Sequence, residues 1–237
     1  MISLEESLNI IFCIIGHELV FLLTDRRHMC NICIMTNDAV IYVNLGDVAT
    51  VSAGYPLRGS AESLKAGDVH LVQLKNVAND GDMNWGDVAS VSLPSKREPS
   101  WLTEDDVIFA ARGTRTYAYA LSNVPPRTVC APQFFVVSIK KPEKLSPRFL
   151  AWQINQKPAQ DYFQRNSTGS YIQNIRRNVL EELPIALPSK ETQMTIAALW
   201  QAAQREQAIL NRLIETRNSQ LEALAIGLAP KSLEARA

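Results

Sequence analysis

The chain has few cysteines, no net charge and no hydrophobic run long enough to cross a membrane. Its four cysteines show no spacing typical of a disulfide framework, so we expect a reduced, cytoplasmic protein. The apolar stretch at residues 10–23 is shorter than the roughly 20 residues that a bilayer span requires, and it contains His17 and Glu18. Glu5 and Glu6 precede it, where a secretory signal would carry basic residues. We therefore expect no membrane segment.

Motifs of catalysis and cofactor binding are also missing from the sequence. No Gly-x-Gly cofactor loop and no Gly-x-x-x-x-Gly-Lys phosphate loop occurs in the chain. The segment from Asn123 to Pro126 has only a superficial likeness to the Asn/Asp-Pro-Pro-aromatic motif of amino-methyltransferases. The three histidines, His17, His28 and His70, lie in no recognisable Ser/His/Asp or Cys/His setting. We predict a non-catalytic protein without a cofactor.

One cysteine pair raises the alternative of a zinc site. Cys30 and Cys33 have the spacing of a zinc knuckle, with His17 and His28 nearby. A zinc site of this type needs a second pair of ligands, and the fourth cysteine, Cys130, lies about a hundred residues further along the chain. We expect no metal.

Proline and glycine are absent from a long C-terminal stretch, and this absence predicts a helix. Neither residue occurs between Pro188 and Gly227, and Ser189 stands where an N-cap is favoured. We predict one helix over residues 189–229, with a length of roughly 57 Å at about 1.5 Å per residue. A seam of apolar residues follows a 3-4 spacing along it, interrupted by Gln207 and Arg217: Ala203, Leu210, Ile214, Leu221, Leu224 and Leu228. Such a seam is typical of a coiled coil, so we interpret the helix as a dimerisation or partner helix. The alternative is a helix that folds back on its own domain.

The residues before this helix carry the signals of a β-rich domain. Strands are predicted from residue 40 onward and at residues 69–74, 88–93 and 134–139, and a helix at residues 146–156 with Leu150 and Ile154 facing inward. The predicted fold class is α+β. We assign residues 35–188 to one domain, 189–229 to the helix and 230–237 to a flexible tail. Residues 1–34 differ from the rest and are interpreted as a dispensable leader, either an upstream extension or the product of a non-native translation start.

Charge is balanced over the whole chain but unevenly distributed along it. Residues 61–106 contain 4 basic and 9 acidic residues, whereas residues 107–178 contain 11 basic and 2 acidic residues. The eleven are Arg112, Arg115, Arg127, Lys140, Lys141, Lys144, Arg148, Lys157, Arg165, Arg176 and Arg177. This segregation predicts a basic face that binds nucleic acid phosphates, and a chance surface cluster is the alternative.

The segment at residues 168–199 resembles the end of a target-recognition domain in the DNA specificity (S) subunits of Type I restriction-modification systems. The matching residues are Gly169, Ser170, Ile175, Leu180, Leu183, Ile185, Leu187, Pro188, Glu191 and Gln193. Ser189 replaces a second proline, and Thr192 separates Glu191 from Gln193. Residues 45–54 and 102–113 are similar to earlier motifs of the family, with Asp105 in place of a glycine. The resemblance covers roughly residues 40–228.

This resemblance implies a subunit that binds double-stranded DNA and directs a methyltransferase subunit, together with a restriction subunit, to its target. We expect the DNA contacts to come from two polar loops, one after the predicted strand near residue 110 and one at residues 164–171, and from neighbouring basic residues. The candidates are Arg112, Thr114, Arg115, Tyr117, Arg127, Gln133, Arg165, Asn166, Ser170, Arg176 and Arg177. Arginine is suited to guanine, and Gln133 or Asn123 to adenine. Arg176 and Arg177 fit phosphate better than bases. Turn and capping chemistry is the alternative role for the Ser, Thr and Asn side chains.

Typical members of the family have two recognition domains, each followed by a helix, whereas this chain has one of each. We therefore expect a homodimer formed through Leu210, Ile214, Leu221, Leu224 and Leu228, or pairing with a second specificity half. Two other interpretations stay open at this point. One is a coiled-coil adaptor that does not bind DNA, and the other is the detached recognition domain of a DNA methyltransferase.

Overall fold

The computed structural model contains two compact units, Met1–Ala39 and Val40–Ala237. The structure describes residues 10–15, 18–23, 40–57, 66–77, 83–93, 99–113, 116–167 and 173–228, the first two segments by their backbone alone. In the first unit, β1 (Ile10–Ile15) and β2 (Glu18–Leu23) form an antiparallel pair. None of the helices in the described segments is long and apolar enough to span a membrane.

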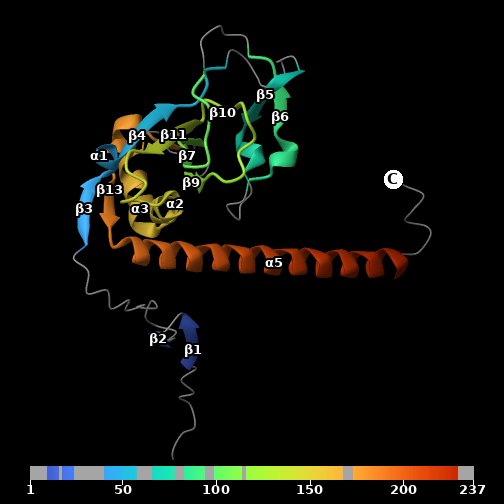
Figure 1. Ribbon diagram of the computed structural model, residues 1–237. Helices are drawn as coiled ribbons and strands as arrows, with labels where there is room; N and C mark the ends of the chain where they lie inside the picture. The colour runs from blue at the N-terminus through green and yellow to red at the C-terminus, as the bar shows by residue number, and fades with distance from the viewer. Residues whose placement is uncertain are drawn as a thin grey trace, which may run out of the picture. The chain divides into compact units, whose positions relative to one another are not determined.

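A four-stranded antiparallel sheet forms the centre of the second unit (Figure 1). Its strands lie in the order β4 (Ala49–Ala53), β11 (Phe134–Ile139), β7 (Asp106–Ala110) and β9 (Tyr117–Ala120). All five residues of β7 are buried, because this strand is covered on both faces of the sheet. The bounds of β11 coincide with the strand predicted at residues 134–139.

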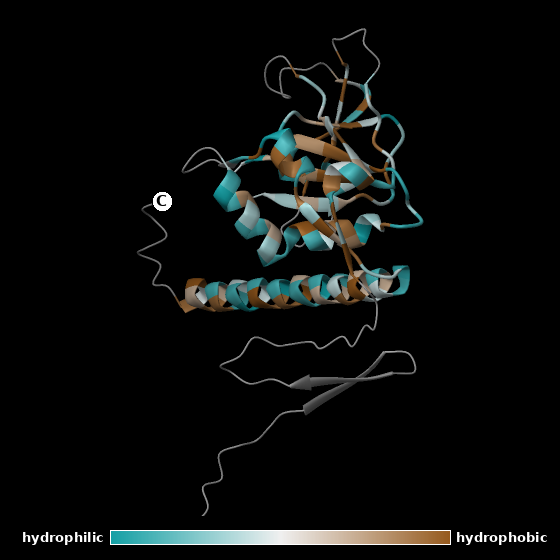
Figure 2. Ribbon diagram, turned by 90° about the vertical axis from the view of Figure 1, so that its left-hand side faces the viewer, coloured by the Kyte–Doolittle hydropathy of each residue, from teal (hydrophilic) through white to brown (hydrophobic). Residues whose placement is uncertain are grey.

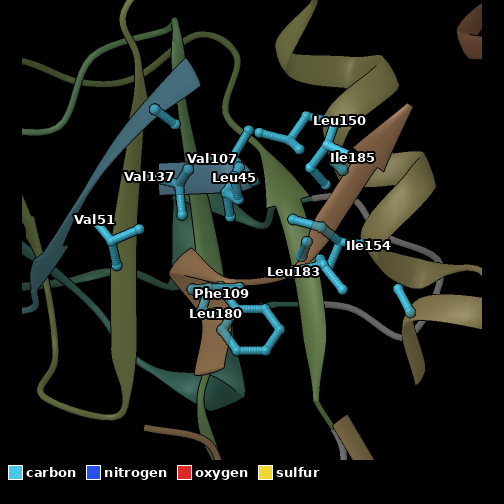
Figure 3. Packing of buried hydrophobic residues seen from close by; sticks show 14 of the residues in the cluster. Leu45, Val51, Val107, Phe109, Val137, Leu150, Ile154, Leu180, Leu183 and Ile185 are labelled. Carbon is cyan, nitrogen blue, oxygen red and sulfur yellow. The ribbon is translucent and has the colours of Figure 1, made fainter. Parts of the chain in front are cut away.

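Short helices cover one face of this sheet. They are α1 (Leu45–Val48), α2 (Pro147–Asn155), α3 (Lys157–Asn166) and α4 (Arg177–Glu181). Val107 and Phe109 of β7 pack on this side with Leu150 and Ile154 of α2, which confirms the predicted inward positions of the two α2 residues (Figure 3). Their four-residue spacing places both on one face of the helix.

A second, smaller sheet covers the opposite face. Its order is β10 (Thr128–Cys130), β5 (Ala66–Val72) and β6 (Ala89–Val91), with β10 parallel and β6 antiparallel to β5. Alternate residues of the central strands, including Ile108 and Phe134, point into this second cluster. The two faces of β7 therefore hold together two separate hydrophobic cores.

The predicted strands of the smaller sheet differ from the observed ones at their ends. The first was predicted at residues 69–74, but the chain turns at Leu74–Asn76 into a 3₁₀ helix, where Gln73 N donates to Asn76 Oδ1 at 2.8 Å. The second was predicted at residues 88–93 and is confined to β6. At β5 a local side-chain to backbone hydrogen bond ends the strand earlier than its hydropathy indicates.

Two small ribbons complete the second unit. β13 (Pro184–Leu187) pairs antiparallel with β3 (Ile41–Asn44), and β12 (Gln173–Asn174) pairs antiparallel with β8 (Arg112–Gly113). Pro184 and Pro188 exclude a continuous helix in this region, and the chain passes from α4 into the extended β13.

The long C-terminal helix, α5 (Lys190–Leu228), has 39 residues and agrees with the predicted helix to within one residue at each end. The hydroxyl of Ser189 accepts a hydrogen bond from Thr192 N at 3.2 Å, which confirms Ser189 as the N-terminal cap. A domain that combines mixed sheets with this helix is of the predicted α+β class.

The first half of α5 is fixed to the domain by a buried amide. Gln193 has no exposed surface. Its Oε1 accepts from Ser146 N at 2.9 Å, and its Nε2 donates to the carbonyl oxygens of Lys144 at 2.8 Å and Pro188 at 3.0 Å. Ala197 is also buried, and Trp200 packs against the helical side of the core.

The second half of α5 has a different environment. From Ile209 to the end of the helix at Leu228 every residue is exposed. Figure 1 shows the C-terminal part of α5 extending beyond the domain, and Figure 2 shows apolar residues, in brown, along the helix. The domain-facing line runs through Gln193, Ala197, Trp200 and Gln204, and its continuation is polar: Asn211, Glu215, Asn218 and Glu222. Residues of the predicted seam, such as Leu210, Ile214 and Leu221, each come directly before a residue of this line. The seam is therefore rotated by about 100° around the helix axis from the domain-facing line. The helix therefore contacts its own domain through one face and presents the seam on another.

Candidate nucleic-acid interface

The ribbon of β8 and β12 presents a polar pair on its outer face. Arg112 lies directly opposite Asn174 in the antiparallel register, so both side chains point to the same side of the ribbon. The next residues along each strand, Ala111 and Ile175, are buried in the core, and Ile175 N donates to Ala111 O at 2.9 Å. Because side chains alternate between faces, burial of these neighbours directs Arg112 and Asn174 outward.

Two further side chains extend this surface. Arg176 is exposed, and its extended backbone (φ −76°, ψ 153°) places its side chain on the same side as that of Asn174. Gln133 is also exposed, and its carbonyl oxygen accepts from Ala111 N at 2.9 Å, which fixes its backbone beside the ribbon. We call these four residues, Arg112, Gln133, Asn174 and Arg176, the ribbon surface. Its two guanidinium and two amide groups are suited to phosphates and base edges.

The loop predicted after β7 is in part a strand. Arg112 and Gly113 form β8 and pair with a segment some 60 residues later in the chain, and no local pattern signals such a pairing. For the same reason Asn174, which the structure places against Arg112, carries no signal in the sequence. Thr114, Arg115 and Ser170 lie outside the described residues.

Tyr117 does not lie on the ribbon surface. It is buried in β9, its ring lies 4.7 Å from that of Tyr119, and its hydroxyl accepts from Gln204 Nε2 of α5 at 3.0 Å. The prediction of Tyr117 as a DNA-contacting residue is therefore corrected. This aromatic residue, at the start of the edge strand β9, packs between that strand and α5.

Arg127 belongs to the smaller sheet and already has partners. Its guanidinium forms an ion pair with Asp68 at 2.9 Å and lies over the ring of Trp101, 5.6 Å from the ring centroid. Its backbone has a positive φ of 56°, and its carbonyl oxygen accepts from His70 N at 3.0 Å. These contacts hold Arg127 against β5, apart from the ribbon surface.

The second predicted loop, residues 164–171, begins as helix. Gln164, Arg165 and Asn166 form the last turn of α3, and Asn166 Nδ2 donates to Tyr162 O at 2.8 Å. This capping role is the alternative that the sequence left open for the polar side chains. Arg165 is exposed in the same turn. Arg177, one helical turn before Glu181, is paired with that carboxylate at 2.8 Å.

The basic residues of the segment 107–178 do not form one face. Arg112 and Gln133 lie next to the start of β11, whereas Lys140, Lys141 and Lys144 follow its end and are exposed. Six strand residues separate the two groups by about 20 Å. The lysine group lies beside the base of α5, where Lys190 Nζ donates to Pro142 O. The count of basic residues over the segment 107–178 therefore added together residues that lie on two separate surfaces.

The single described cysteine side chain is unsuited to a metal. Burial raises the pKa of the Cys130 thiol to about 12, so the thiol is protonated at neutral pH. Within the described residues no three His, Cys, Asp or Glu side chains come together as metal ligands. Cys30, Cys33, His17 and His28 lie outside those residues.

Comparison with solved structures identifies similar folds. The S subunit of the Type I restriction-modification system from M. genitalium is similar over 78% of this chain and 44% of its own length, with a TM-score of 0.53 and 18% identity. A second solved structure comes from work on the structural basis of complex assembly and conformational transition of the type I R-M system. It is similar over 78% of this chain and 43% of its own length, with a TM-score of 0.54 and 16% identity. This chain thus spans less than half the length of either. No curated protein matches it.

Sequence comparison with protein families gives the assignment. The model of the Type I restriction modification DNA specificity domain matches residues 37–222, which is most of the chain and includes both the ribbon surface and α5 as far as Glu222. In these systems the specificity subunit is the non-catalytic component. The chain belongs to the family of Type I restriction-modification DNA specificity domains.

Proposed function

We propose that this chain is a sequence-specific DNA-binding component of a specificity subunit, and that it directs a Type I methyltransferase to its target in the cytoplasm. The observation that carries the proposal is the family match over residues 37–222, which covers one recognition domain and one helix. The single domain reads one half-site of the target.

The ribbon surface is the part of the recognition domain that we place on DNA. Arg112 and Arg176 are exposed, and neither guanidinium is paired with a carboxylate within the described part of the chain. Arg176 contacts phosphate, while Arg112 and Gln133 contact base edges. Arg115 and Thr114, which follow β8 directly, contribute from the adjacent segment.

The seam of α5 is the contact to a second specificity half. Its apolar residues are exposed over the second half of the helix, and Leu221 is 65% exposed. Two copies joined through Leu210, Ile214, Leu221, Leu224 and Leu228 provide two recognition domains. Two-fold symmetry then requires a target with two inverted half-sites. A different specificity half, with its own recognition domain and helix, would bury the same seam residues. The methyltransferase subunit and the restriction subunit bind the assembled pair.

Two alternatives predict different behaviour. A coiled-coil adaptor forms the same dimer but has no affinity for DNA. The detached recognition domain of a DNA methyltransferase binds DNA but supports modification only together with a catalytic chain. Exposed apolar residues on α5 favour an assembled specificity pair, because a detached domain has no need of a second half.

The test combines DNA binding with methylation mapping. Binding of the full chain to duplex DNA is measured over a series of salt concentrations, and log K is expected to fall by about 0.9 for each phosphate contact per unit of log salt. Sequencing of methylated bases in cells that carry the chain and its cognate methyltransferase then gives the target. Arg112→Ala with Arg176→Ala is the binding-deficient control. Absence of salt-dependent binding, with the dimer intact, favours the adaptor.

A further inference from the structure

We propose that Asn174 is a positioning residue that aims the guanidinium of Arg112 at a guanine in the major groove. The inference rests on the proposed function and adds to it one specific base pair and the residue that selects it. The juxtaposition that carries it is the hydrogen bond from Arg112 Nε to Asn174 Oδ1, 3.2 Å long, between the two strands of one ribbon.

Three backbone pairings fix the positions of Arg112 and Asn174. Gln173 pairs with Gly113 and Asn174 with Arg112 in the antiparallel register. Ile175 N donates to Ala111 O at 2.9 Å, and both of these residues are almost fully buried. Since these buried residues anchor one end of the ribbon, it cannot rotate about its own axis. The packing of the core therefore determines the position of Asn174 relative to Arg112.

The hydrogen bond selects which donors of Arg112 face outward. A guanidinium has five N–H donors, and one of these is on Nε. Asn174 binds Nε, and within the described residues the two terminal nitrogens have no further hydrogen-bond partner. The edge of the guanidinium that carries these two nitrogens is therefore left for a ligand, and their spacing matches O6 and N7 of guanine. Other bases do not offer two acceptors in this arrangement at the major-groove edge.

Two other arginines of the chain have a different type of partner. Arg127 is paired with the carboxylate of Asp68 and Arg177 with that of Glu181. Each of these ion pairs neutralises the charge that phosphate or a base would attract. Arg112 is oriented by a neutral amide and keeps its positive charge. Orientation without neutralisation is the combination that a base-reading arginine requires.

The test uses two variants of Asn174 that remove these two properties one at a time. Asn174→Leu has a similar shape but no acceptor, so it loses the orientation and leaves the charge of Arg112 intact. Asn174→Asp keeps the acceptor but introduces a carboxylate next to Arg112. The full chain is used to select sequences from a pool of randomised duplexes, and the guanine whose preference disappears in Arg112→Ala is identified. Asn178→Leu, an exposed residue of α4, is the matched control.

The two variants are expected to lose different properties: one loses the preference for guanine, and the other loses affinity for duplex DNA of any sequence. Asn174→Leu loses roughly 5- to 150-fold of the preference for that guanine and keeps its affinity for unselected duplex. Asn174→Asp keeps the preference and loses affinity for every duplex. Replacing that guanine by 7-deazaguanine, which lacks N7, weakens the parent and Asn174→Asp but not Asn174→Leu. Asn178→Leu behaves as the parent, and thermal unfolding confirms that all variants are folded.

Several results overturn the inference. They are a guanine preference that survives in Asn174→Leu, an equal loss of preference in both variants, or an even loss of affinity across sequences in Asn174→Leu. In each of these cases the parent still selects a sequence, so the proposed function stands. A parent chain that selects no sequence contradicts the proposed function itself, and the inference fails with it.

Discussion

The two halves of α5 depart from the usual relation between polarity and burial in two different ways. In the first half a polar side chain, Gln193, is fully buried and makes three hydrogen bonds. In the second half the apolar side chains of Leu221 and Leu224 are 65% and 64% exposed. A helix that belonged only to its own domain would show the reverse, with apolar residues buried and polar residues exposed. The comparison agrees with the proposal that α5 binds its own domain through one half and a second chain through the other.

The type of contact differs between the two partners. The domain holds the first half through directional hydrogen bonds, which fix the helix in one orientation. The seam offers apolar area, which gives affinity but little direction of its own. In the proposed pair, the contact between α5 and the domain determines the orientation of the two copies, and the seam determines the strength of their association. The following experiments separate these two roles.

The largest effect is expected on the seam. Leu210→Asp with Leu221→Asp removes two apolar side chains from each helix, each contributing about 1.5–3 kcal/mol when buried, and places charges at the interface. We expect loss of the dimer and of the two-part target, with the recognition domain still folded. Light scattering, with and without the methyltransferase subunit, measures the mass. Asn211→Asp with Asn218→Asp adds the same charges on the polar line and should leave the mass unchanged. A parent chain that is monomeric in both conditions contradicts the homodimer.

The next effect concerns the anchor of α5. Gln193→Leu leaves the amide N–H of Ser146 and the carbonyl oxygens of Lys144 and Pro188 without their partner. A buried unpaired group costs about 1–3 kcal/mol, so we expect a loss of about 3 kcal/mol or more in the free energy of unfolding. Urea denaturation measures it. Gln220→Leu on the exposed half should change stability by less than about 0.5 kcal/mol. Equal effects of the two changes would show that Gln193 is not an anchor.

A smaller effect is expected at Arg112 of the ribbon surface and at Arg115, which follows β8 in the sequence. Arg112→Ala with Arg115→Ala should weaken binding to the cognate duplex by about 1–3 kcal/mol for each base that is no longer bound, and relax the target at the corresponding positions. An arginine that holds only phosphate would weaken all sequences evenly. Fluorescence anisotropy with cognate and scrambled duplexes distinguishes the two results. Unchanged binding of the cognate duplex rules out this placement of the DNA.

The smallest effect is expected from the N-terminal residues. Met1–Ala39 form a compact unit of their own, and the family match begins at residue 37. A chain that starts at Met35 should keep its DNA affinity and its unfolding free energy to within about 0.5 kcal/mol, the usual range for changes away from a core. Circular dichroism and the same anisotropy assay check this. Loss of folding would show that the first unit contributes to the core of the second.

Most of the fold could be predicted from the sequence because it depends on local patterns. The helix α5 follows from a stretch without proline or glycine and from the cap at Ser189, and α2 follows from the spacing of Leu150 and Ile154. Strand β11 follows from an uninterrupted run of apolar residues. The end of β5 was less predictable, because the side chain of Asn76 binds the backbone and ends the strand.

The candidate interface was less predictable because it depends on contacts between distant segments. Arg112 was identified from its place after a strand, but its partner Asn174 comes from a different part of the chain. Tyr117 was assigned to DNA by its place in the same polar segment, and tertiary packing buries it against α5 instead. The basic segment divided into separate surfaces because β11 carries its two ends about 20 Å apart.

The anchor at Gln193 also fixes the rotation of α5 about its own axis, and therefore the direction in which the seam faces. Because the first turn is fixed, inserting one residue in the exposed half moves everything beyond it by about 1.5 Å and turns it by about 100°. The seam beyond the insertion then faces away from its partner. An insertion of seven residues turns it by nearly two full rotations and restores the alignment, with a displacement of about 10.5 Å, or roughly three base-pair steps at 3.4 Å each. Length variation in this helix is therefore expected to be tolerated in steps of whole heptads.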